Sequence, residues 1–87
     1  MNKQAEAYEL YKTDLCGFCY RVRHFLEANG IDIPLKDVNA DATAFRDLLS
    51  GGGRTTVPCL RIQRGEEVEW MFESADIMRY LAQQYGV

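Results

Sequence analysis

The residues of this chain best suited to chemistry are its cysteines: Cys16 and Cys19 lie three positions apart, and Cys59 stands alone. A Cys-x-x-Cys pair either exchanges thiols and disulfides or supplies half of a metal site. A structural zinc site usually needs four ligands, and only Cys59 and the single histidine, His24, could complete one. We therefore expect no zinc site within one chain, a surface or packing role for His24, and redox chemistry at Cys16 and Cys19.

The position of Cys16 favours it as the nucleophile. It follows a predicted strand at residues 8–13 and precedes a predicted helix at about 18–29, where apolar residues recur at helical spacing. The free N–H groups and the dipole of a first helical turn stabilise a thiolate there. Cys19 lies one turn deeper on the same face, where it can attack a mixed disulfide but is more enclosed. We expect Cys16 to attack and Cys19 to resolve.

Basic residues surround this motif in a chain whose net charge is −3. They are Lys12, Arg21, Arg23 and His24. Positive charge there would stabilise a thiolate and attract an anionic thiol such as glutathione. The alternative is that Arg21 and Arg23 only cover a solvated helix face. The acidic overall balance argues against nucleic acid or a membrane surface as a partner.

The middle of the chain reads as a strand followed by a helix. Residues 31–38 alternate apolar and polar positions, and Pro34 places this strand at a sheet edge because it cannot donate a ladder hydrogen bond. Asp41 is a plausible cap for the helix, which should end at the glycines 51–53. Its predicted buried face consists of Phe45, Leu48 and Leu49.

The last third reads as a hairpin followed by a helix. Residues 57–62 and 67–72 are strand-like, and a loop with a glycine joins them. Ser74 is expected to cap the last helix, with Asp76 in its first turn. The order β-α-β-α-β-β-α predicts an α/β thioredoxin-like fold, a four-stranded mixed sheet flanked by three helices. The first two strands should be parallel and the last two antiparallel.

Length and composition predict a single domain over residues 1–87, with a loose segment at 1–7. No apolar run approaches the roughly 18 residues of a spanning helix, and the first residues are polar rather than signal-like. We expect a monomer in the cytoplasm.

With these residues in view, the chain resembles glutaredoxins from about residue 8 to 85. The match lies in residues 11–19, in Gly53-Arg54-Thr55-Thr56-Val57-Pro58, in the hairpin after it, and in residues 72–77. The resemblance implies a glutathione-dependent thiol–disulfide oxidoreductase, with glutathione as co-substrate. Its partners would be disulfide-containing or glutathionylated proteins.

The resemblance also implies a glutathione site. Pro58 would be cis, and the Val57 backbone would pair with the glutathione cysteine like an added strand. The γ-glutamyl carboxylate would lie at the start of the last helix, where Ser74 serves equally well as a helix cap alone. The residues implied for glutathione are Lys12, Phe18, Arg54, Thr56, Val57, Pro58, Ser74 and Asp76.

Several positions depart from the family pattern. Gly17-Phe18 replaces the usual Pro-Tyr within the motif and is typical of relatives that bind iron–sulfur clusters. The alternative function is therefore a dimeric cluster carrier that uses Cys16 and glutathione.

Thr13 replaces a common lysine, and the neighbouring Lys12 points to the opposite strand face. Glu73-Ser74 resembles the N-terminal domain of glutathione transferases, which makes a transferase-like binding module another alternative. An electron donor recharged by thioredoxin reductase is a third.

Two further features have a plain structural interpretation. Cys59 follows Pro58 directly and is expected to pack as a small hydrophobic residue. The alternative is a second disulfide or glutathionylation at Cys59. The aromatic and thioether side chains of Trp70, Met71 and Phe72 are expected to pack the hairpin.

Overall fold

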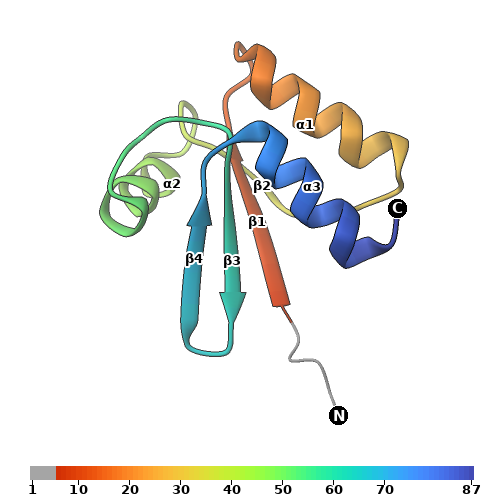
Figure 1. The fold of residues 1–87 in the computed structure, drawn as a ribbon. Coiled ribbons are helices and arrows are strands. Elements are labelled where there is room, and N and C mark those ends of the chain that lie inside the picture. Colours follow the sequence, from red (N-terminus) through yellow and green to blue (C-terminus); the bar gives the residue numbers. More distant parts are fainter. Residues whose placement is uncertain (1–5) are drawn as a thin grey trace.

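The computed structural model describes residues 6–87, and these follow the predicted order of strands and helices (Figure 1). The elements are β1 (Glu6–Lys12), α1 (Gly17–Ala28), β2 (Leu35–Asp37), α2 (Ala42–Asp47), the π-helical turn η1 (Leu48–Gly52), β3 (Cys59–Arg64), β4 (Glu67–Met71) and α3 (Ser74–Tyr85). No helix of this part of the chain is long and apolar enough to cross a membrane.

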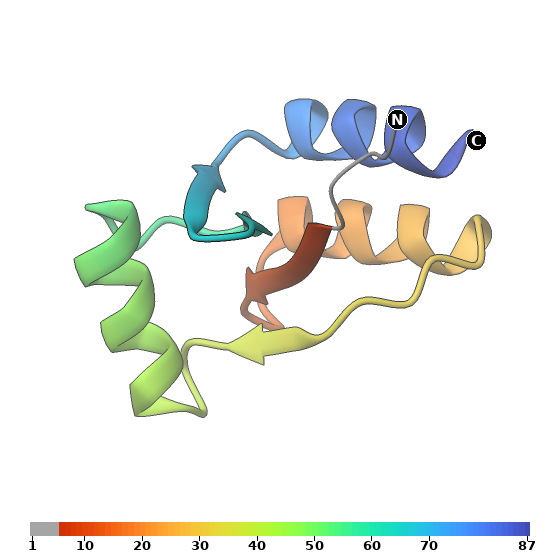
Figure 2. The same ribbon diagram turned by 90° about the horizontal axis from the view of Figure 1, so that it is seen from below.

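The strands form one mixed sheet in the order β2-β1-β3-β4. β1 pairs in parallel with β2, while β3 is antiparallel to both β1 and β4. Helices α1 and α3 lie side by side on one face, and α2 with η1 lies at the other (Figures 1 and 2). This arrangement confirms the predicted thioredoxin-like fold.

Both faces of the central strands are covered, so β1 is apolar on both sides near its end. Leu10 packs with Val22 of α1 and Ile77 of α3. Tyr11, its neighbour, faces the other way and packs with Leu48 beside α2. The two clusters hold the end of β1 and the start of α1 in fixed positions, and the cysteine motif lies between those two elements.

The second strand is shorter than predicted. Ile31 and Ile33 are buried, but they lie in an extended segment outside β2. The physical reason is Pro34, which has no N–H to donate and only accepts a hydrogen bond through its carbonyl from Leu10 N–H, at 2.9 Å. The edge position of β2 agrees with the prediction.

The cap of α2 is confirmed, and of its predicted buried face Leu48 is confirmed while Phe45 and Leu49 are wrong. The Asp41 carboxylate accepts hydrogen bonds from the N–H groups of the first turn, at 2.9 and 3.4 Å. The buried side chains are Ala44 and Leu48, four positions apart, whereas Phe45 is 43% and Leu49 49% exposed. In so short a helix, one narrow i, i+4 stripe makes the contact with the sheet, and the neighbouring apolar side chains stay outside.

At the N-terminus, residues 1–5 of the predicted loose segment lie outside the described residues, whereas Glu6 and Ala7 are the first residues of β1. The Glu6 carboxylate accepts hydrogen bonds from Tyr8 at 2.5 Å, Tyr80 at 2.6 Å and Arg64 at 2.6 Å. The network ties α3 to the sheet.

Candidate active site

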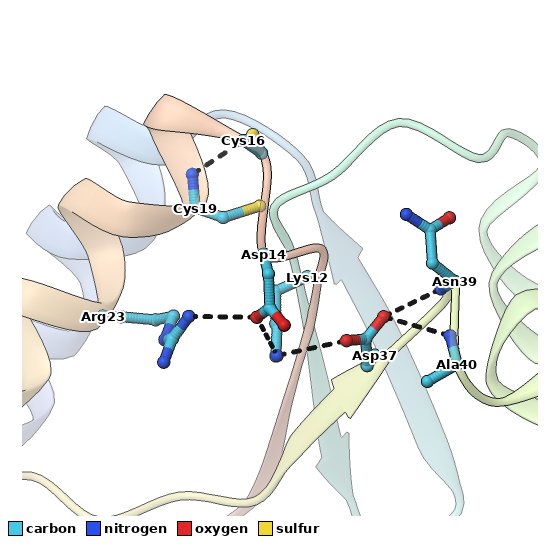
Figure 3. Close-up of polar contacts among 8 residues, drawn as sticks. All are labelled: Lys12, Asp14, Cys16, Cys19, Arg23, Asp37, Asn39 and Ala40. Carbon is cyan, nitrogen blue, oxygen red and sulfur yellow. Dashed lines mark hydrogen bonds and ion pairs between the residues drawn. The ribbon is translucent and has the colours of Figure 1, made fainter.

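Cys16 occupies the N-cap position of α1, at the junction predicted from the sequence. Its Sγ accepts a hydrogen bond from the backbone N–H of Cys19 at 3.3 Å (Figure 3). Its thiol in turn donates to the backbone carbonyl of Val57 at 3.7 Å. The sulfur is thus held between a helix start and the segment before β3. Cys16 is partly exposed, while Cys19 is buried.

The pKa values of the two thiols are shifted in opposite directions. Burial alone would raise the pKa of Cys16, but hydrogen bonds from Cys19 and from the Phe18 backbone outweigh it and lower that pKa. Burial raises the pKa of Cys19 to about 11, and the adjacent Cys16 sulfur adds to the rise. Since the thiolate is the attacking species, this difference favours Cys16 over Cys19 as the attacking thiol.

The basic residues near the motif do not act on Cys16, contrary to the expectation from their clustering. Arg23 pairs with Asp14 at 3.3 Å, and the Arg21 guanidinium lies over the Phe18 ring, 5.9 Å from its centroid. His24 stacks on an exposed tyrosine of α1. The pKa of Cys16 is lowered instead by N–H groups of the first helical turn.

Lys12 is buried at the end of β1. Its Nζ donates to Asp14 at 2.6 Å and to Asp37 at 3.4 Å (Figure 3). The hydrogen bond to Asp14, more than any other contact, raises the pKa of Lys12. Asp76, also expected at the glutathione site, pairs with Arg79 at 3.0 Å on the exposed side of α3. Neither Lys12 nor Asp76 lines the pocket.

A pocket of about 220 Å³ opens beside the Cys16–Val57 contact. Its lining consists of Phe18, Arg54, Thr56, Val57, Pro58, Phe72, Glu73 and Ser74. Six of these residues were expected at the glutathione site, and the structure brings them together from three separate segments. The Val57–Pro58 peptide bond is cis, as the resemblance implied.

Sequence reasoning missed two lining residues, Phe72 and Glu73. Phe72 was expected only to pack the hairpin, but its ring forms a wall of the pocket as well. The signal that could have found both is their position directly before Ser74, at the junction of β4 and α3.

The predicted capping role of Ser74 is wrong. Ser74 is the first residue of α3, and the N-cap position is held by Glu73, whose side chain makes no capping hydrogen bond. The start of α3 therefore borders the pocket without a side-chain cap, and such a helix start favours a carboxylate or another anion.

Cys59 belongs to a different part of the structure from Cys16 and Cys19. It is fully buried with Tyr11 and Leu48 on the α2 side of the sheet. Burial raises its pKa to about 12, so the thiol is protonated at neutral pH. This placement agrees with the packing role expected for it.

Within residues 6–87, no three His, Cys, Asp or Glu side chains come close enough to hold a metal ion. What the arrangement provides is an acidic thiol, a partner thiol beneath it, and a backbone carbonyl beside an open pocket. This combination suits exchange between a thiol and a disulfide.

Comparison with known proteins finds a matching family model and several similar proteins. Residues 15–84 match the family model of the glutathione S-transferase N-terminal domain. Glutaredoxin 3 of Escherichia coli (strain K12) is 28% identical over 50 residues, which are 58% of this chain and 60% of the relative. The chain thus spans less than two thirds of this curated relative.

Two solved structures show how far the likeness extends. A single-site variant of the thioredoxin-like protein BC3987 is 27% identical over 85% of this chain and 97% of its own, with a TM-score of 0.66. A variant of human glutathione-S-transferase T1-1 in its apo form is 26% identical, with a TM-score of 0.72; the match covers 93% of this chain but 33% of the transferase.

Proposed function

The chain belongs to the glutathione S-transferase N-terminal domain family, and from this membership we propose that it is a glutathione-dependent thiol–disulfide oxidoreductase. The family relationship supports a glutathione-related redox or transferase function in an enzyme of the thioredoxin-like class. The proposal selects the redox function, in which Cys16 is the nucleophile and Cys19 the resolving thiol.

The observation that favours a redox function over a transferase function is the acidity and position of the Cys16 thiol. Its pKa is lowered at the start of α1, and it lies against Val57 at the mouth of the pocket. A transferase needs a group that activates the thiol of bound glutathione, whereas a disulfide reductase needs a nucleophilic thiol of its own. Cys16 is such a thiol, and Cys19 lies one turn behind it.

In the one-thiol route, the Cys16 thiolate attacks the glutathionyl sulfur of a mixed disulfide. The new S–S bond joins Cys16 to glutathione, and the substrate leaves as a thiolate that takes a proton from water. A second glutathione thiolate then attacks the glutathionyl sulfur. Oxidised glutathione leaves, and the Cys16 thiolate is restored.

In the two-thiol route, a protein disulfide is attacked and Cys16 becomes joined to the substrate. Cys19 loses its proton, attacks the Cys16 sulfur and releases the substrate as a thiol, which leaves a Cys16–Cys19 disulfide. Two glutathione molecules reduce that disulfide and become oxidised glutathione.

The pocket provides binding groups for glutathione along its length. The Val57 backbone can pair with the cysteinyl residue as an added strand does. The uncapped start of α3 next to Ser74 suits a carboxylate. Arg54 and Phe18, both on the pocket wall, add a cation and an apolar face.

The test is NADPH consumption coupled through glutathione reductase, with the mixed disulfide of glutathione and 2-mercaptoethanol as substrate. We expect turnover by the parent chain, none by Cys16→Ser, and retained turnover by Cys19→Ser through the one-thiol route. Activity that survives in Cys16→Ser would refute the nucleophile. A parent chain without turnover, its free thiols verified, would contradict the proposal and favour the cluster carrier or the donor recharged by thioredoxin reductase.

A further inference from the structure

One wall of the pocket is an arginine that lies on an aromatic ring. The Arg54 guanidinium carbon is 4.2 Å from the centroid of the Phe72 ring, and both side chains line the pocket. Within residues 6–87, no carboxylate lies at ion-pair distance from Arg54. The ring of Phe72, rather than a counter-ion, therefore holds this cation.

The ring in turn lies against a glycine of η1. A Cβ atom on Gly52 would come 2.9 Å from Cζ of Phe72, closer than real Cβ atoms approach their neighbours. The next residue, Gly53, adopts a φ of 83° at the end of η1 and leads the chain into Arg54. The same turn thus receives the ring and places the arginine over it.

A guanidinium over an aromatic ring keeps its donors available. The contact pairs none of the guanidinium N–H groups with an oxygen, so these groups can still donate to a ligand. These are the donors that bind a carboxylate through two parallel hydrogen bonds. On Arg54 they lie at the wall of the pocket, where a ligand can reach them.

We infer that Phe72 is a positioning residue of this pocket: seated against Gly52, its ring holds the Arg54 guanidinium where it binds a carboxylate of the ligand. The inference rests on the proposed function for the ligand, a peptide thiol or thioether that carries more than one carboxylate. Phe72 acts on the ligand through Arg54, and Gly52 acts through Phe72.

The test is calorimetric titration with S-methylglutathione, which lacks a free thiol and cannot react with Cys16. Loss of the ring in Phe72→Leu should weaken binding by about two- to fivefold, the range of a cation–π contact at an exposed site. Arg54→Gln should weaken binding at least as much. Because Phe72 acts through Arg54, the double variant should bind as Arg54→Gln does, without further loss.

Gly52→Ala should push the Phe72 ring, and with it the Arg54 guanidinium, out of position. It should therefore weaken binding as Phe72→Leu does. Ser50→Ala is the matched control, because Ser50 is an exposed residue of the same turn and lies away from this pocket. In each variant, alkylation of Cys16 by iodoacetamide should keep the parent rate, which shows that the fold around the thiol is intact.

Two results with the variants would overturn the inference. One is a Phe72→Leu variant and a Gly52→Ala variant that both bind S-methylglutathione as tightly as the parent. The other is a double variant whose loss is the product of the two single losses, since that would mean independent roles. A parent chain that does not bind S-methylglutathione would overturn it as well. A parent chain that binds the ligand without turnover would refute only the oxidoreductase proposal.

Discussion

Glu6 allows a quantitative test of how the fold holds α3, the helix whose start borders the pocket. Its carboxylate accepts hydrogen bonds from Tyr8, Tyr80 and Arg64, at 2.5 to 2.6 Å. Arg64 also pairs with Glu69 of β4 at 2.9 Å. One carboxylate thus connects the first strand, the hairpin and the last helix.

The size of the effect follows from the pKa of Glu6. Burial alone would raise this pKa, but the hydrogen bonds from Tyr8, Tyr80 and Arg64 outweigh it and lower the pKa from 4.5 to about 2. At about 1.4 kcal/mol for each pKa unit, the ionised carboxylate contributes about 3 kcal/mol of stability. The side chain is 14% exposed, so solvent screens little of it. Because the folded pKa lies below the unfolded one, this stability is present above about pH 4.5 and is lost as the pH falls toward about 2.

Glu6→Gln keeps the shape of the side chain and removes its charge. We expect the free energy of unfolding at pH 7 to fall by about 2–3 kcal/mol, which lowers Tm by about 10–20 °C in a domain of this size. Urea unfolding measures the change, and Glu67→Gln is the matched control because Glu67 is an exposed carboxylate of β4. Glu67→Gln should leave the stability within about 0.5 kcal/mol of the parent.

The pH dependence separates this account from a general loss of packing. Between about pH 5 and pH 2, the parent chain should lose stability more steeply than Glu6→Gln, since the variant has no carboxylate to protonate at this position. Parallel loss in both proteins would refute the reasoning, as would a Glu6→Gln variant that is as stable as the parent at pH 7.

Other predictions concern the site and α2. Attack by Cys19 on a mixed disulfide at Cys16 should accelerate about tenfold per pH unit around neutrality, because burial raises the pKa of Cys19 and only its thiolate attacks. Stopped-flow kinetics measures this rate, and a flat pH profile would contradict the reasoning. Gly51→Ala should destabilise the fold by about 1–3 kcal/mol, because its Cβ would clash with Cζ2 of Trp70. An unchanged Tm would disprove the close approach. Asp41→Ala should destabilise the fold by about 1 kcal/mol through the lost cap of α2, and denaturant unfolding with no change in midpoint would count against it.

The spacing of apolar residues, together with the glycines and prolines that end helices and strands, was sufficient to predict the fold. Val22 and Leu26 mark the buried stripe of α1, and Gly30, with a φ of 67°, ends the helix region where predicted. Placing Cys16 between a strand and this helix also predicted its acidic thiol. Such features depend on neighbours along the chain, which a single sequence displays.

Features that depend on packing between distant segments were harder to predict. Ile33 looked like a strand residue because it is apolar and alternates with polar neighbours, yet it fills the core from outside the sheet. Phe45 and Leu49 looked buried, but the short α2 contacts the sheet only through Ala44 and Leu48. Periodicity indicates which residues share a face, but not how wide the contact is.

The direction of charged and aromatic side chains was the least predictable feature of the site. Lys12 and Arg23 lie near Cys16 in the sequence, but both turn to Asp14 because an ion pair is available there. Phe72 reaches the pocket because the turn at residues 51–53 leaves room for its ring. These outcomes depend on which partner lies close in the folded structure, and a single sequence does not display that.

The central claim is that Cys16 carries the glutathionyl group. The most direct measurement is intact-protein and peptide mass spectrometry of the Cys19→Ser variant, after reaction with the mixed disulfide of glutathione and 2-mercaptoethanol and without added reductant. The account predicts one glutathionyl group per chain, on Cys16, formed at a rate that follows ionisation of a thiol with a lowered pKa. A chain that stays unmodified, or that carries the group on Cys59 instead, would contradict the account.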